Sequence, residues 1–242
     1  MKKFFILCLI AFVMCSCDKD SVVETPMVTI SFNQQMVTGL PMTRGETNDF
    51  LNIIAEQTPT YVYVTLKNLD LGKTFTCKSN ESIAIPIGNY EISSSNETKS
   101  YFNVNGGRQF TLPQLKGDTF NTTINNNTKT ITLNVCYNCF AVFALIDECK
   151  SVSCHATGNT YYSFDKQGKY YVSYFQNGCI VKITPYDDSN EFISTSYTFS
   201  TTYDVNKVYA EYGKYYVIHP QQVDKVTGSF NMQLPNMVEG EI

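Results

Sequence analysis

From residue 27 onward, apolar and polar side chains alternate with a period of two, and β-branched and aromatic residues gather in short runs. Successive side chains of a strand point to opposite faces of a sheet, so this period predicts strands rather than helices. We therefore predict an all-β protein, with residues 49–56 as the only candidate helix. The predicted strands are 27–32, 61–68, 73–77, 82–85, 89–94, 101–104, 109–112, 129–135, 140–146, 160–164, 169–176, 179–185, 195–200, 214–218 and 228–234.

Turn residues support the strand predictions independently. Asn177-Gly178 separates two β-rich runs and predicts a hairpin, because both central residues of a type I′ turn need positive φ. Residues 105–107, Asn-Gly-Gly, give a second hairpin signal. Residues 66–74 read as strand, turn and strand, with the bend at Asp70 and Gly72.

The N-terminus is typical of a secretory signal peptide over residues 1–16. Two lysines precede an apolar run of about eleven residues, which is too short for a membrane span of about 20 residues. Ser16 supplies the small residue expected before a cut at Cys17. The segment 14–17 resembles a bacterial lipobox, although Met14 stands where Leu is usual.

Cys17 is therefore predicted to be lipidated, with palmitate or a similar acyl chain, and residues 17–26 to form a tether. The following Asp18-Lys19-Asp20 looks like the charged export tag of Bacteroidetes surface lipoproteins. We expect a protein anchored by lipid in the outer membrane and exposed on the cell surface. The alternative is simple secretion, with Cys17 as an ordinary thiol.

Charge narrows the range of partners. Loss of two lysines with the leader leaves 16 of the 18 basic residues against 22 acidic ones, a net charge of −6. Such a chain lacks the surplus of Lys and Arg that nucleic-acid binding needs, so we predict no nucleic-acid partner. Membrane attachment would then depend on acyl chains rather than on a basic patch.

About 226 residues follow the leader, enough for two β domains of ordinary size. The polar stretch 121–130, with three asparagines at its centre, is the best candidate connection between the halves. We place an N-terminal β-sandwich domain at 27–135 and a C-terminal one at 136–242.

The case for catalysis is thin. The sequence holds no H-E-x-x-H, G-x-S-x-G, glycine-rich phosphate loop or Walker lysine, and only two histidines, His155 and His219. Cys154 and His155 are adjacent, so on a strand they would face opposite ways. The acidic loop 187–191 lacks the spaced order of a calcium site and is interpreted as a solvated turn. We predict no enzyme activity, no cofactor and no metal.

Six cysteines remain after the leader and Cys17 are set aside. An even number in an exported chain favours disulfides or buried thiols, with 15 pairings open. The spacing C-x-x-C also raises the alternatives of a zinc site or a redox motif, but it lacks the usual glycine and no βαβ pattern surrounds it. The six are Cys77, Cys136, Cys139, Cys149, Cys154 and Cys179.

Tyrosine is concentrated in the second half, with 12 of 17 between residues 161 and 216. Aromatic rings can form a platform for glycans, although the absence of Trp weighs against this reading. Ordinary β propensity, with half-buried rings and solvated hydroxyls, explains the same pattern.

Several local features together resemble the fimbrillin-type lipoproteins of Bacteroidetes. They are the lipobox, Met42-Thr43-Arg44-Gly45, the strand-turn-strand 62–76, the segment 85–92 and the β run 131–146. The resemblance covers residues 17 to about 146 and implies two transthyretin-like β-sandwich domains. It also implies cleavage by a trypsin-like protease, for which Arg44-Gly45 matches the site, and assembly when another subunit's strand fills the groove of the lost strand.

Two function classes stay open at this point. The first is a structural or accessory subunit of surface fimbriae, in which residues 27–32 are lost and residues 228–234 act as donor, with Phe230, Met232 and Leu234 on one face. Modest length and internal cysteines depart from the family, so an anchor, a tip or an unassembled lipoprotein is also open. The second class is a surface lipoprotein that binds a glycan or a host protein through its Tyr-rich half.

Overall fold

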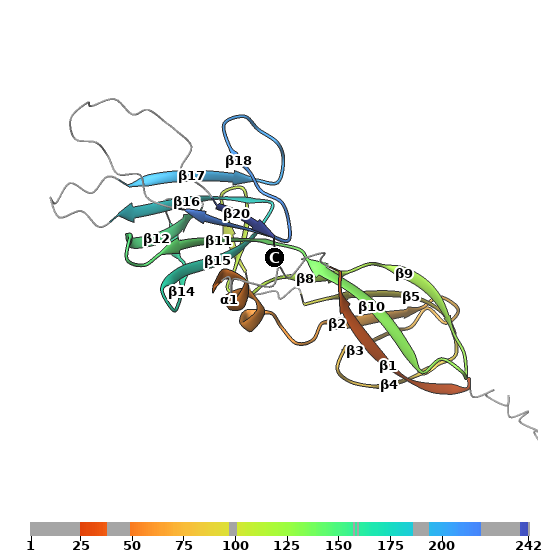
Figure 1. Ribbon diagram of the computed structural model, residues 1–242. Coiled ribbons are helices and arrows are strands. Elements are labelled where there is room, and N and C mark those ends of the chain that lie inside the picture. The colour runs from red at the N-terminus through yellow and green to blue at the C-terminus, as the bar shows by residue number, and fades with distance from the viewer. Residues whose placement is uncertain are drawn as a thin grey trace, which may run out of the picture.

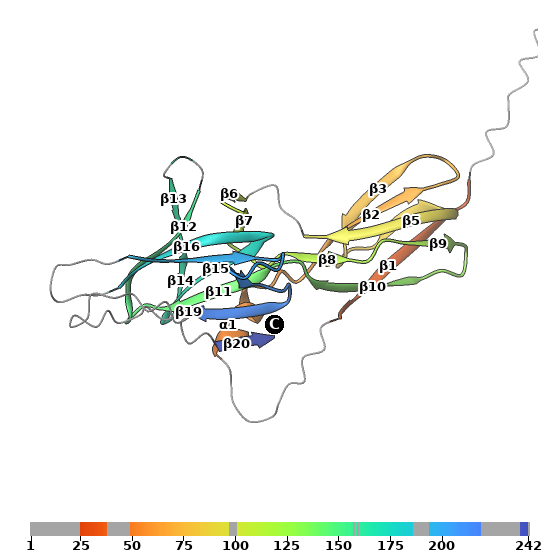
Figure 2. The same cartoon turned by 90° about the horizontal axis from the view of Figure 1, so that it is seen from above.

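The computed structural model describes residues 25–37, 49–96, 101–156, 158, 160–185, 194–218 and 238–241. Within these ranges the chain forms twenty strands and one helix, which confirms the all-β prediction. Figures 1 and 2 show two sandwich-like halves that lie end to end, with the first strand in one half and the last strand in the other.

The first half is an eight-stranded sheet that wraps around one apolar core. Its order is β3-β2-β5-β8-β10-β1-β4, with β9 beside β5. The core holds Ile30, Leu66, Ile92 and Leu133, each at most 1% exposed. The strands are β1 (Met27–Met36), β2 (Tyr63–Asn68), β3 (Thr74–Lys78), β4 (Ile83–Pro86), β5 (Gly88–Ser95), β8 (Leu115–Gly117), β9 (Phe120–Ile124) and β10 (Thr130–Tyr137).

The second half packs two sheets face to face. One has the order β20-β19-β11-β15-β7-β6 with β14 beside β15, and the other has the order β13-β12-β16-β17-β18. Phe140, Phe175, Phe199 and Tyr216 form an aromatic centre between them. The strands are β6 (Phe102–Val104), β7 (Gly107–Phe110), β11 (Phe140–Leu145), β12 (Cys149–His155), β13 (Tyr161–Ser163), β14 (Asp165–Gln167), β15 (Tyr170–Gln176), β16 (Gly178–Pro185), β17 (Thr195–Ser200), β18 (Val208–Tyr209), β19 (Lys214–Ile218) and β20 (Val238–Glu241).

The helix α1 (Asp49–Gln57) confirms the predicted helix at 49–56. It covers the outer face of the sheet that contains β11, where Ile54 is buried beside Phe143 and Tyr215. β11 is thus buried on both faces, with Val142 toward the second sheet and Phe143 toward α1. This explains why its sequence is an unbroken apolar run instead of an alternating one.

The interpretation of 121–130 as a connection between the halves is wrong. Residues 120–124 form β9, which pairs with β5 from Gly88↔Ile124 to Ile92↔Phe120. Its outward positions are polar because that face meets solvent. Only two residues, 138 and 139, separate β10 from β11, the strands that lead from one half into the other. The proposed boundary at 135/136 stays a prediction; α1, β6 and β7, from earlier in the chain, pack with second-half strands.

The hairpin predicted at Asn177-Gly178 is also wrong. β15 and β16 belong to different sheets, so the chain crosses between sheets at this point. Asn177 has a φ of 69°, but Gly178 has no positive φ, and a type I′ turn requires both. The hairpin signals at 105–107 and 66–74 are confirmed by the antiparallel pairs β6–β7 and β2–β3.

Fourteen of the predicted strands coincide with strands of the described residues, and the fifteenth, 228–234, lies outside them. Six observed strands were not predicted. β8, β14, β18 and β20 have two to four residues, and β9 and β12 are mostly polar, so none presents a clear apolar alternation.

Candidate functional site

Strand β1 is hydrogen-bonded along both edges. Residues 27–30 pair antiparallel with β4, and residues 31–36 pair parallel with β10. Ile30 is fully buried, and Val28 and Phe32 pack against the same core. β1 therefore joins the two edges of the first sandwich and also fills part of its interior.

Further hydrogen bonds, from side chains and at the ends of the strand, also hold β1 in place. The Ser31 amide donates to the Lys129 carbonyl at 2.9 Å, and the Ile87 amide donates to the Pro26 carbonyl at 2.9 Å. Ser79, which is buried, donates through its hydroxyl to the Gln34 side chain at 2.8 Å. Removal of β1 would leave these groups, and two strand edges, without their partners.

The chain runs from β1 to α1 through residues 37–48. The predicted processing residues Arg44 and Gly45 fall in this stretch and lie outside the described residues, as do Cys17 and the predicted donor strand 228–234. The two ends of the stretch belong to different halves, because β1 lies in the first sandwich and α1 packs on the second.

An aromatic cluster and an ion pair hold α1 on the second half. The Phe50 ring lies 5.0 Å from that of Phe143, 4.7 Å from Tyr170 and 5.2 Å from Tyr215. The Lys169 ammonium lies 2.9 Å from the Asp49 carboxylate. Its hydrogen bond and its charge keep the pKa of Asp49 below the usual value.

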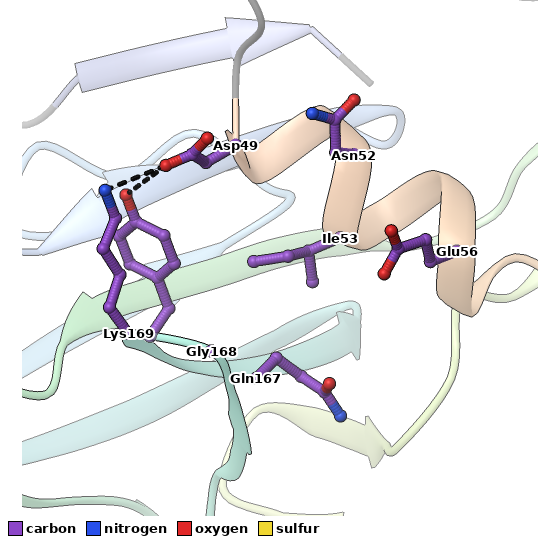
Figure 3. Close-up of a pocket in the computed structure, with 8 residues that line it drawn as sticks. Asp49, Asn52, Ile53, Glu56, Gln167, Gly168 and Lys169 are labelled. Carbon is purple, nitrogen blue, oxygen red and sulfur yellow. Dashed lines mark hydrogen bonds and ion pairs between the residues drawn. The ribbon is translucent and has the colours of Figure 1, made fainter.

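A shallow hollow of about 380 Å³ lies between α1 and the β14–β15 turn. Figure 3 shows Ile53 between the polar side chains of this hollow, and Asp49 bridging to Lys169 and Tyr170 at one end. Amide and carboxylate groups around an apolar centre can bind a small polar ligand. The lining residues are Asp49, Asn52, Ile53, Glu56, Gln167, Gly168, Lys169 and Tyr170.

All six internal cysteines are free thiols in the structure. Cys77 and Cys136 belong to the first half, where Cys136 is exposed on β10. Burial raises the pKa values of Cys139 and Cys149 to about 12, so these thiols are protonated at neutral pH. Within the described ranges, no three His, Cys, Asp or Glu side chains are grouped closely enough to hold a metal ion.

Cys154 and His155 lie on opposite faces of β12. Cys154 is fully buried in the core, whereas the His155 ring stacks on Tyr161 at 5.0 Å and lies 2.9 Å from the Asn105 amide nitrogen. Adjacent positions on a strand require this separation. His219 and the acidic loop 187–191 lie outside the described residues.

The second-half tyrosines divide between core and surface. Six are less than 9% exposed, namely Tyr170, Tyr171, Tyr174, Tyr197, Tyr215 and Tyr216. Tyr161, Tyr203, Tyr209 and Tyr212 are 40% exposed or more, and the last three lie on the loop that carries β18. The sequence alone does not distinguish this loop, because its pattern does not separate exposed tyrosines from buried ones.

That loop has a defined conformation. The Tyr212 hydroxyl hydrogen-bonds to Asn177 at 3.2 Å, and Lys207 forms an ion pair of 2.9 Å with Asp204. Tyr203 contacts the Tyr209 ring with 6.4 Å between the centroids. The loop therefore presents exposed aromatic rings from a fixed backbone.

No protein-family model and no curated protein match this chain. Solved structures with a similar arrangement include a fimbrial assembly protein from Parabacteroides distasonis (TM-score 0.43, 11% identity, 79% of this chain and 91% of that one). A candidate cell adhesion protein from Bacteroides fragilis has TM-score 0.38 and 7% identity, with 89% and 98% covered. A candidate polysaccharide-binding protein from Bacteroides thetaiotaomicron has TM-score 0.38 and 10% identity, with 80% and 91% covered.

These neighbours are named as fimbrial assembly, cell adhesion and polysaccharide-binding proteins. Their identities and TM-scores are too low to transfer a function, so the function of this chain has to be argued from its own residues. Among the described residues, no helix has the length and apolar character that crossing a membrane requires.

Proposed function

We propose that this protein is a non-catalytic surface lipoprotein, a fimbrillin-like structural or accessory subunit that assembles by exchange of β1 for a strand of another subunit. The observation that carries the proposal is the position of β1. It is paired on both edges and buried at Ile30, yet it precedes the Arg44 segment that connects it to all later elements.

The energetics of the exchange support this proposal. Loss of β1 would expose the edges of β4 and β10 and uncover the apolar side chains around Ile30. Full burial of one such side chain contributes about 1.5–3 kcal/mol to stability. A strand with an apolar residue at every second position would restore both the hydrogen bonds and the burial. Residues 228–234, with Phe230, Met232 and Leu234, have this pattern.

The anchoring of α1 supports the same proposal. A cut after Arg44 would leave four residues, 45–48, before α1, whose Phe50 is held by three aromatic rings of the second half. The cut would therefore free the β1 segment alone, and the second sandwich would keep its outer layer.

The test is an unheated SDS gel of cell envelopes, because donor-strand polymers resist mild SDS. Wild-type protein is expected to give a ladder that collapses to one band on heating. Arg44→Ala should abolish the ladder, whereas Lys73→Ala, at an exposed position of the β2–β3 turn, should keep it. A ladder that persists in Arg44→Ala would contradict maturation at Arg44, and a single wild-type band would contradict polymerisation.

A second candidate function is binding of a glycan or a host protein. The observation in its favour is the aromatic loop with Tyr203, Tyr209 and Tyr212, fixed by Asn177. A glycan array tests it with the double variant Tyr203→Ala/Tyr209→Ala and with Tyr63→Ala, an exposed tyrosine of the first half, as control. Binding that only the double variant loses would favour this function, and no binding by wild type would argue against it.

A further inference from the structure

Cys154 and Cys179 lie together in the core of the second sandwich. β12 and β16 are antiparallel neighbours in which Cys154 is paired with Val181. Cys179 is two residues from Val181 along β16, so its side chain projects from the same face as Cys154. Both cysteines are fully buried in one apolar cluster.

The other four cysteines are placed apart from this pair. Cys77 and Cys136 belong to the first half, on β3 and β10. Cys139, between β10 and β11, is buried in the separate cluster that α1 covers. Cys149 shares the core but pairs with Pro185, at the other end of β12. The fold therefore selects one of the pairings that the sequence left open.

We propose that Cys154 and Cys179 are the disulfide-forming pair of this protein, oxidised after export by a protein or small-molecule disulfide. One thiolate attacks the oxidant disulfide, a mixed disulfide forms, and one oxidant thiol leaves. The second thiolate then attacks the bound sulfur, the Cys154–Cys179 bond forms, and the second oxidant thiol leaves. Two protein thiols are thereby oxidised, one oxidant disulfide is reduced to two thiols, and the thiol protons pass to the released thiols.

The surroundings of the pair determine when this reaction takes place. Burial, together with contact with Cys154, raises the pKa of Cys179 well above its ordinary value, which suppresses the reactive thiolate in the folded protein. Oxidation therefore belongs to folding, before β12 and β16 close over the thiols. Once formed, the bond is shielded from reductants.

Formation of the bond requires a small backbone movement. Diagonal Cα atoms on antiparallel strands are about 7–8 Å apart, whereas a disulfide needs about 4.4–6.8 Å. The strands must therefore approach by about 1 Å at this point. Cys154 is one residue from the end of β12 and Cys179 one residue from the start of β16, so the movement is needed near strand ends and not at a strand centre.

Trypsin provides a direct readout. Cleavage at lysines gives peptide 151–166, in which Cys154 is the only cysteine, and peptide 170–182, in which Cys179 is the only one. The full-length mature chain is unfolded, refolded with glutathione and its disulfide, alkylated and digested without reduction. The two peptides should appear as one linked species that a reductant separates. Recovery of both as alkylated monomers would overturn the proposal.

Variants test the assignment independently. Cys154→Ser should abolish the linked species, and Cys149→Ser, at a buried thiol of the same core, should keep it. Oxidised wild type should melt about 5 °C or more above its reduced form, a shift that Cys154→Ser should lack. If either variant fails to fold, the wild-type peptide map alone decides.

Because the inference rests on the export that the proposed function assumes, the same map is made on protein from cell envelopes. A link that forms in glutathione but is absent from envelopes would contradict export into an oxidising compartment, while the pairing would stand. Absence of the link in both preparations would overturn the pairing. A link in both supports the pairing and the route.

Discussion

Ser31 of β1 lies beside Thr130 of β10 in a parallel pair, with the two hydroxyl oxygens 3.2 Å apart. The same strand runs antiparallel to β4. A strand that replaced β1 would therefore have to run parallel to β10 to satisfy both edges. This requirement fixes both the position and the orientation of the incoming strand in the proposed exchange.

Ile30→Ala should destabilise the first sandwich. Its side chain is fully buried, so the loss of burial and the resulting cavity should lower the free energy of unfolding by about 2–5 kcal/mol. Asn33→Ala, at an exposed position of the same strand, should change it by less than about 0.5 kcal/mol. Urea titration followed by circular dichroism measures both. Equal effects would show that β1 is not part of the core.

Phe50→Ala should loosen α1 from the second half. Phe50 is partly exposed but contacts three aromatic rings, so we expect a loss of about 2–4 kcal/mol in the free energy of unfolding. Asn52→Ala, on the exposed side of the helix, serves as the control. Hydrogen exchange of the α1 amides should rise only in the Phe50 variant. Unchanged protection there would contradict the anchoring role.

The Asp49–Lys169 pair should make stability depend weakly on pH. Lys169 lowers the folded-state pKa of Asp49, so the contribution of the pair is present above the unfolded pKa of Asp49 and is lost as pH falls through the lowered folded value. Asp49→Asn should therefore shift the urea midpoint slightly at pH 7, and the shift should disappear once the pH falls below the lowered folded-state pKa of Asp49. High salt should shrink the shift, since the pair is exposed. A shift that persists in acid would refute this origin.

In the Arg44→Ala background, where Cys17 stays joined to the rest of the chain, Cys17→Ala should release the protein from the membrane. The mature chain has a net charge of −6, so it lacks an electrostatic route to an anionic surface, and the proposed acyl chains would supply the attachment. Fractionation of cells should move the variant to the soluble fraction, while Cys77→Ala should stay with the membrane. Unchanged partitioning of the Cys17 variant would end the lipoprotein interpretation.

Local pattern was sufficient to predict much of the fold. The alternation around Ile30 and the amphipathic segment at Ile54 identified β1 and α1, because one face of each element is buried. Pairing between distant segments was not accessible in the same way. Asn177-Gly178 has the residues typical of a hairpin turn, but here the chain crosses from one sheet to the other. Glycine is needed at position 178 because a Cβ there would lie 2.6 Å from the Phe199 carbonyl oxygen.

In the candidate site, too, local features could be predicted from the sequence, whereas the pairing of distant segments could not. A basic residue in a segment with turn formers marked Arg44, but only the register of β1 reveals which edges its loss would expose. Likewise, the cysteine count allowed many pairings, and the alignment of β12 with β16 brings Cys154 near Cys179. Non-local register, which no single segment encodes, supplied both results.

Limited trypsinolysis of the folded protein tests the central claim most directly. The products are identified by N-terminal sequencing, and their assembly is measured by native mass spectrometry. We predict that the first cut falls after Arg44, that a product beginning at Gly45 appears, and that the fragment containing β1 is then lost as oligomers form. Resistance of Arg44 while interior lysines are cut, or a cut product that retains β1 and stays monomeric, would contradict the account.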